Sequence, residues 1–179
     1  MKKRKINALQ RSLKTIEIKH EEDVRILFDF REQPLQQPTN INLTIQLEGK
    51  NKVYIVVIAN KRTNLSLNIT YKTSKKSNSI INNTAFVMDS AQIKLHDKVI
   101  VEQPIDEVHL RQQIYLYSTQ ARGEAIPEMV LKTNKVKIAT HESSISDINE
   151  REQAYFASKG IDYKKLQQLL LEDYISYCL

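Results

Sequence analysis

Residues 65–71 read LSLNITY, and residues 41–47 read INLTIQL. In both stretches an apolar side chain alternates with a polar one, which is the pattern of a β-strand with one buried face. Residues 53–59, VYIVVIA, are apolar throughout and predict a strand that is buried on both faces. These stretches indicate that the protein is mainly β.

Further short apolar runs extend this pattern along most of the chain, at a spacing of roughly ten residues. They lie at residues 13–18, 24–30, 91–95, 99–101, 108–111, 114–117, 129–131 and 136–138. The basic segment 73–79 predicts an exposed loop between strands. The rhythm is typical of an all-β stack, but it does not separate a sandwich from a barrel or a β-helix.

The pattern changes after Ser146, where two helices are expected. Asp147 and Glu150 have the spacing of a capping box, and Gly160 stands where a helix C-terminus needs a left-handed residue. Asp162 can then cap a second helix over residues 163–177. The apolar stripe of that helix consists of Leu166, Leu169, Leu170, Tyr174 and Tyr177. The sequence therefore predicts a short α-helical hairpin with an apolar face.

Length and charge set the domain plan. The chain has 179 residues, and its 27 Lys and Arg against 21 Asp and Glu give a net charge of +6. We predict a basic tail at residues 1–11, a β core at 12–145 and a helical domain at 146–179. A basic charge permits nucleic acid as a partner, but few aromatic side chains accompany the lysines, so nucleic-acid binding is not expected.

Cys178 is the only cysteine, which excludes an internal disulfide and a multi-thiolate zinc site. This cysteine usage fits a reducing cytoplasm. No apolar run is long enough for a transmembrane helix, and the basic start lacks the apolar core of a secretory signal. We therefore expect a cytoplasmic protein with no membrane partner.

Motifs of the common enzyme classes are missing: there is no Walker loop, dinucleotide fingerprint, zincin helix or nucleophile elbow. The sequence predicts that the protein is not an enzyme. Of the four histidines, His141 is placed at the predicted end of the last strand, beside Glu142. An imidazole next to a carboxylate is either a metal ligand or a capping residue, and spacing alone leaves both open.

The C-terminal third resembles the SufB/SufD family, the scaffold subunits of the SUF iron–sulfur cluster assembly system. The resemblance rests on Pro127, on His141 followed by Glu142, and on residues 154–161, AYFASKGI, before a Leu-rich final helix. The distance from His141 to Tyr155 is that of the family. The match is good over residues 108–174 and only architectural before them.

This resemblance implies a right-handed parallel β-helix followed by a small helical domain. It also implies pairing with a SufB-like scaffold through the β core and docking of a SufC-like ABC ATPase on the helices. The residues implied for the ATPase are Tyr155, Gly160, Leu166, Leu170 and Tyr174. His141, and more weakly Glu142, would contact iron or an iron–sulfur cluster transiently, and only together with a partner subunit.

Three departures from the family shape the functional hypothesis. The chain is less than half the usual family length, Ser143 and Ser144 replace the small residues after the histidine, and the SufB scaffold cysteine would fall near Gln112 or Gln113. A cluster needs thiolates or substitutes for them. The expected function is therefore that of a non-catalytic SufD-like subunit. A β-rich interaction module without an assembly role remains the alternative, and a homodimer stays open.

Overall fold

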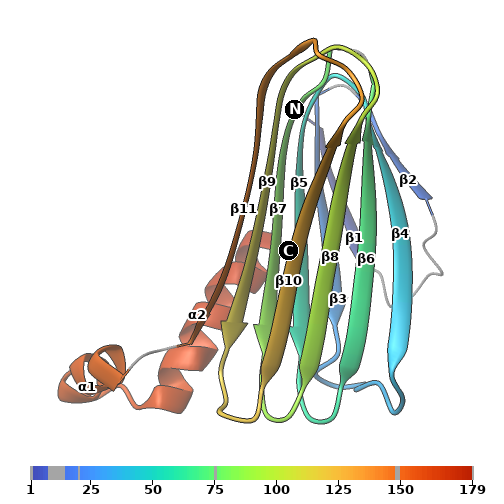
Figure 1. Cartoon of the computed structure of the whole chain (residues 1–179). Helices are drawn as coiled ribbons and strands as arrows, with labels where there is room; N and C mark the ends of the chain where they lie inside the picture. Colours follow the sequence, from blue (N-terminus) through green and yellow to red (C-terminus); the bar gives the residue numbers. More distant parts are fainter. Residues whose placement is uncertain (1, 8–14, 20, 75, 148–149, 179) are drawn as a thin grey trace.

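The computed structural model describes the chain except for residues 1, 8–14, 20, 75, 148–149 and 179 (Figure 1). The described part contains eleven strands and two helices. The strands are β1 (Lys2–Asn7), β2 (Thr15–Ile18), β3 (Glu22–Asp29), β4 (Thr39–Leu47), β5 (Lys50–Ala59), β6 (Asn64–Thr73), β7 (Asn78–Val87), β8 (Gln92–Val101), β9 (Ile105–Leu116), β10 (Arg122–Leu131) and β11 (Val136–Asp147). The helices are α1 (Glu150–Ser158) and α2 (Tyr163–Cys178).

Successive strands alternate between two sheets, so the chain winds into a solenoid. One sheet has the order β1-β3-β5-β7-β9-β11 and the other the order β10-β8-β6-β4-β2. All neighbouring strands are parallel. The register pairs Lys50 with Asn78 and Asn78 with Glu107, offsets of 28 and 29 residues for one turn. The expected parallel β-helix is confirmed, and a sandwich or barrel is excluded.

The predicted alternation explains where the core lies. In β6 and β8 each odd-numbered side chain is buried between the two sheets, while the even-numbered ones lie on the outer surface. Tyr71 and Ile55 are among the fully buried members of this core. In β5 both faces are buried from Val56 to Ala59, as predicted, because a helix covers the outer face of that sheet.

Residues in the left-handed backbone region begin successive turns of the solenoid on one side. Glu21, Gly49 and Lys76 have φ angles of 61°, 69° and 59°. The N–H of Glu21 donates to the carbonyl of Lys50 at 2.6 Å, and that of Asn78 donates to Gly49 at 2.9 Å. These bonds join one turn to the next and fix the register of the stack.

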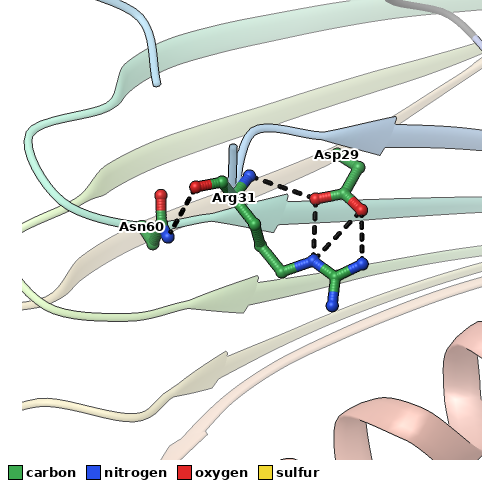
Figure 2. A network of polar contacts seen from close by, with 3 residues as sticks. All are labelled: Asp29, Arg31 and Asn60. Atoms are coloured by element: carbon green, nitrogen blue, oxygen red, sulfur yellow. Dashed lines mark hydrogen bonds and ion pairs between the residues drawn. The ribbon is translucent and has the colours of Figure 1, made fainter. Parts of the chain in front are cut away.

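At the other side, side chains bind the long connection after β3 to the body. Arg31 forms a bidentate contact with Asp29, with 2.6 Å between Nη2 and Oδ2 (Figure 2). Asn60 donates from Nδ2 to the Arg31 carbonyl at 3.1 Å. The residues after β3 are thereby attached to the turn between β5 and β6.

The helical hairpin forms as expected. Gly160 has a φ of 74°, and Asp162 accepts a hydrogen bond from the Lys165 N–H at 2.7 Å, which is the predicted N-cap. Helix α2 lies beside the six-stranded sheet (Figure 1). No helix in the described ranges is both long and apolar enough to cross a membrane.

Several local predictions were wrong. Residues 78–87 form β7, which was not predicted, and Lys2–Asn7, assigned to a basic tail, form β1. Runs 91–95 and 99–101 belong to one strand, as do 108–111 and 114–117. The last strand extends to Asp147, beyond the predicted end of the β core at residue 145, and the helix start predicted from the capping box falls on residues 148–149, outside the described residues. The stack is longer and more regular than its apolar runs suggested.

Candidate interaction surfaces and the predicted metal ligand

The solenoid ends in a turn whose two strands each have a neighbour on one side only. Strand β10 is the last of the five-stranded sheet and β11 the last of the six-stranded sheet. Side chains that continue the core lie on their inner faces, and nothing in the chain's described part stacks on them. We call this surface the open end. Its inner-face residues are Ala125, Pro127, Met129 and Leu131 of β10 and Ala139, His141, Ser143 and Ile145 of β11.

The open end exposes apolar side chains. Leu131 and Ile145, on the inner faces, are 49% and 48% exposed, and Ile138, on the outer face of β11 in register with Glu107, is 44% exposed. Among the described residues they make up three of the five exposed large hydrophobic side chains, and the other two lie on the helical hairpin. Leu131 ends β10 and Ile145 lies near the end of β11, so the exposed apolar groups are spread along the last turn. Both sheet edges also carry unpaired backbone groups, which are a template for another strand.

Proline limits how β10 can be extended. The N–H groups of Arg122 and Lys132 donate to strand β8 and its flank, at 3.0 and 2.8 Å. Because N–H groups alternate along a strand, the nitrogen of Pro127 faces the free edge, where it offers no hydrogen. A strand that adds to β10 therefore finds no donor at Pro127. This restricts the register in which the added strand can pair.

Ion pairs fasten the last turn to the one before it. Glu128 accepts from Lys98 at 2.8 Å and contacts His96 at 3.3 Å, and the hydrogen bond from Lys98 lowers the pKa of Glu128. Lys132 contacts Glu102 at 2.7 Å, and Lys137 contacts Asp106 at 2.6 Å. The charged outer surface thus sets the position of β10 and β11 while their inner faces stay uncovered.

His141 lies in the middle of β11, so the prediction that it stands at the end of the last strand was wrong. Its register partner is Leu110, which is buried in the core, so His141 is on the inner face of the open end. Glu142 pairs with Arg111 on the outer face, and 2.6 Å separates Oε1 from the Arg111 Nε. Adjacent strand residues point to opposite faces. The structure therefore does not bring His141 and Glu142 together.

The described residues contain no group of three or more His, Cys, Asp and Glu side chains that could hold a metal ion. A histidine alone is an incomplete ligand set for iron. The geometry leaves His141 exposed on a surface where a second chain could supply the remaining ligands.

The hairpin residues predicted to bind a partner separate into two groups. Leu166 is 4% exposed and packs on the outer face of the six-stranded sheet, and Tyr174 contacts Phe86 edge to face at 4.9 Å between ring centroids. Tyr155 is 61% exposed, and Leu169, from the predicted apolar stripe of the second helix, is 42% exposed. The side chain of Leu170 lies outside the described residues. Tyr155 and Leu169 are thus the accessible apolar groups, whereas Leu166 and Tyr174 hold the hairpin in place.

Sequence reasoning missed a polar cluster inside the solenoid. Asp97 is fully buried and accepts hydrogen bonds at Oδ2 from Asn83 at 2.6 Å and from Gln112 at 2.5 Å. Asn83 also exchanges hydrogen bonds with the Tyr71 hydroxyl. Burial raises the pKa of Asp97 to about 6, although both amide hydrogen bonds oppose the shift. The sequence did contain a signal for it. Asp97 is two residues from both Leu95 and Val99, so in a strand its side chain lies on the same buried face as theirs.

Comparison with known proteins agrees with this architecture. Residues 38–174 match the family model described as SUF system FeS cluster assembly, SufBD core domain. The chain is similar to an iron–sulfur cluster assembly SufBD family protein of Pyrococcus horikoshii, with 27% identity over 89 residues. That match covers 50% of this chain and 20% of the relative. Because the family model spans most of the solenoid and the hairpin, the chain belongs to the SufBD core-domain family of the SUF iron–sulfur cluster assembly system.

Proposed function

We propose that the protein is a non-catalytic, SufD-like subunit of a cytoplasmic iron–sulfur cluster assembly complex. The open end would pair with a SufB-type scaffold, and the helical hairpin would bind a SufC-type ATPase. The observation that carries the proposal is the distribution of exposed apolar groups: among the described residues they occur on these two surfaces, around Leu131 and Ile145 and around Tyr155.

Pairing at the open end is supported by two physical features. Covering Leu131 and Ile145 removes apolar surface from water, which is favourable in proportion to its area. A partner strand at β10 or β11 would also use backbone groups that otherwise bond only to water. An isolated solenoid end of this kind needs a cap, and a partner subunit can supply it.

Iron or a nascent cluster is the cargo of such a complex. The His141 imidazole lies on the surface that a partner would cover, and its neighbours on the inner face, Ala139 and Ser143, provide no thiolate. Gln112, near which the resemblance placed the SufB scaffold cysteine, is buried one strand below Ser143. Thiolate ligands would therefore come from the SufB-type partner, with His141 contributing one nitrogen.

We expect the double variant Leu131→Asp, Ile145→Asp to lose the SufB-type partner while it stays folded. Both side chains are about half exposed in the free chain, so charge there adds little strain, but burial of two carboxylates in an interface is costly. The test is co-expression with both partners, followed by size-exclusion chromatography with light scattering. Binding weakened by at least about a hundredfold, or about 3 kcal/mol, is expected.

The matched control is Tyr155→Ala, Leu169→Asp, which alters the exposed apolar groups of the hairpin. This variant should lose the ATPase and retain the scaffold, the reverse of the open-end variant. If both double variants keep both partners, the assignment of partners to these surfaces is wrong. A wild-type chain that binds neither partner would favour the alternative, a β-rich interaction module without an assembly role.

His141→Ala is expected to lower the yield of reconstituted cluster in the complex by several fold without loss of fold or partner. The matched control is His109→Ala, because His109 lies on the outer face of β9, where Nδ1 is 2.7 Å from the Thr140 hydroxyl. Cluster content is measured by iron and sulfide analysis with visible absorbance. Equal cluster yield in the two variants would contradict a metal-binding role of His141.

A further inference from the structure

Two buried oxygen atoms in the polar cluster have no hydrogen-bond partner. They are Oδ1 of Asp97 and Oε1 of Gln112, and both residues are 0% exposed. The same two side chains are already joined, because the Gln112 amide lies 2.5 Å from Asp97 Oδ2. A buried polar atom without a partner is destabilising, because it has lost its hydrogen bonds to water, so two in one contact are unusual.

Among the described residues no basic side chain hydrogen-bonds to Asp97, and His96 acts on it only through space, where its charge when protonated lowers the pKa of Asp97. Strand β6 contributes Tyr71, β7 contributes Asn83 and β9 contributes Gln112, and the register neighbour on β10 is Pro127. Burial raises the pKa of Tyr71 well above its usual value, so this hydroxyl remains neutral. The adjacent bases of β8 are His96 and Lys98, which contact Glu128 on the outer surface.

Both amide contacts fall on one carboxyl oxygen. The Nδ2 of Asn83 and the Nε2 of Gln112 each donate to Oδ2 of Asp97, so Oδ1 of Asp97 and Oε1 of Gln112 are left without a donor. Asp97 makes two contacts of 2.5 and 2.6 Å. A carboxylic acid and a carboxamide can form a mutual pair in which each group donates one hydrogen bond and accepts one.

We propose that Asp97 and Gln112 form a proton-binding site inside the solenoid, in which the neutral acid donates from Oδ1 to Oε1 of Gln112. One proton then gives partners to both orphaned oxygens and removes the unpaired charge from the core. Gln112 is in register with Ser143 of the open end, so the site lies one strand below that surface. The site makes the stability of the last turns of the solenoid depend on pH.

The direction of this dependence follows from the raised pKa. The folded protein holds the proton up to about pH 6, whereas an unfolded Asp97 releases it near the ordinary pKa of this side chain, 3.8. The stabilisation by the proton is complete below the unfolded value and is lost as the pH rises through the folded value. Between those limits the unfolding equilibrium constant should increase about a hundredfold, since the shift is about two units.

The test uses the full chain and its Asp97→Asn variant. An asparagine supplies the same donor and acceptor as the neutral acid and cannot ionise, so its stability should not follow this titration. Urea unfolding from about pH 4 to about pH 7.5 should show the unfolding constant of the wild type rising about a hundredfold relative to Asp97→Asn. Asp106→Asn removes a partly exposed surface carboxyl and should leave the wild-type profile in place.

Infrared spectroscopy reads the proton directly. At about pH 5 the difference spectrum, wild type minus Asp97→Asn, should contain the carbonyl stretch of a neutral carboxylic acid, because partly protonated surface carboxyls contribute equally to both proteins. Parallel pH profiles of the wild type and Asp97→Asn would overturn the proposal. A folded wild type whose difference spectrum lacks the acid band would overturn it too, because Asp97 would then be ionised. If Asp97→Asn does not fold, the pH titration of the wild-type band decides alone.

Discussion

Phe86→Ala is expected to lower the free energy of unfolding by about 3–5 kcal/mol and to release helix α2 from the sheet. Phe86 is 1% exposed and lies on the outer face of β7. Its ring stacks on Tyr115 at 5.4 Å and meets Tyr174 of α2 edge to face at 4.9 Å. The alanine variant loses the ring that joins helix and sheet, and the cavity it leaves is not readily refilled by neighbouring rings.

Two measurements check this expectation. Urea unfolding gives the change in stability, and limited proteolysis should cut the variant first within the hairpin. Tyr155→Ala is the control, because this ring is 61% exposed and its removal should change stability by less than about 1 kcal/mol. A Phe86→Ala protein within 1 kcal/mol of the wild type, with an equally protected hairpin, would contradict the assigned role of this ring.

Ile55→Ala is expected to destabilise the solenoid by about 2–5 kcal/mol. Ile55 is 1% exposed on the inner face of β5, in register with Ile26 on one side and Asn83 on the other. A cavity there would lie within the stack, where each turn is supported by the two turns that flank it. The loss is measured by urea unfolding at constant pH.

The control for Ile55→Ala is Ile145→Ala, an isoleucine of the same sheet that is 48% exposed on the inner face of the terminal strand. Its truncation should cost less than about 1 kcal/mol in the free chain. Similar losses from both substitutions would mean that the terminal turn is as tightly packed as the central one. That result would count against an uncovered open end.

The parts of the fold that could be predicted are those in which core and surface differ in polarity. Strands β4 and β6 alternate cleanly, so their runs were found. Strand β7 was missed because Ser79 and Asn83 are buried polar residues, which remove the contrast between its two faces. In β8 the residues His96, Asp97 and Lys98 form a polar interval that divided one strand into two predicted ones.

The site was only partly predictable for a related reason. Residues at an open end do not alternate in exposure, so the second half of β11 resembled a polar linker and His141 was placed at a strand end. The hairpin was easier, because Gly160 and Asp162 are local signals that need no tertiary contact to be recognised. Only the three-dimensional packing shows that Leu166 faces the protein's own sheet whereas Tyr155 faces solvent.

The near-constant register offset has a consequence for how such chains can change in length. A segment of 28 residues links Lys50 to its register partner Asn78, and the segment from Asn78 to Glu107 is nearly equal. If one whole turn were removed, the strands on either side of it would still be parallel. Their inner-face residues would still point into the core. Evolution can therefore shorten or lengthen this architecture by complete turns and preserve the surfaces at its two extremities.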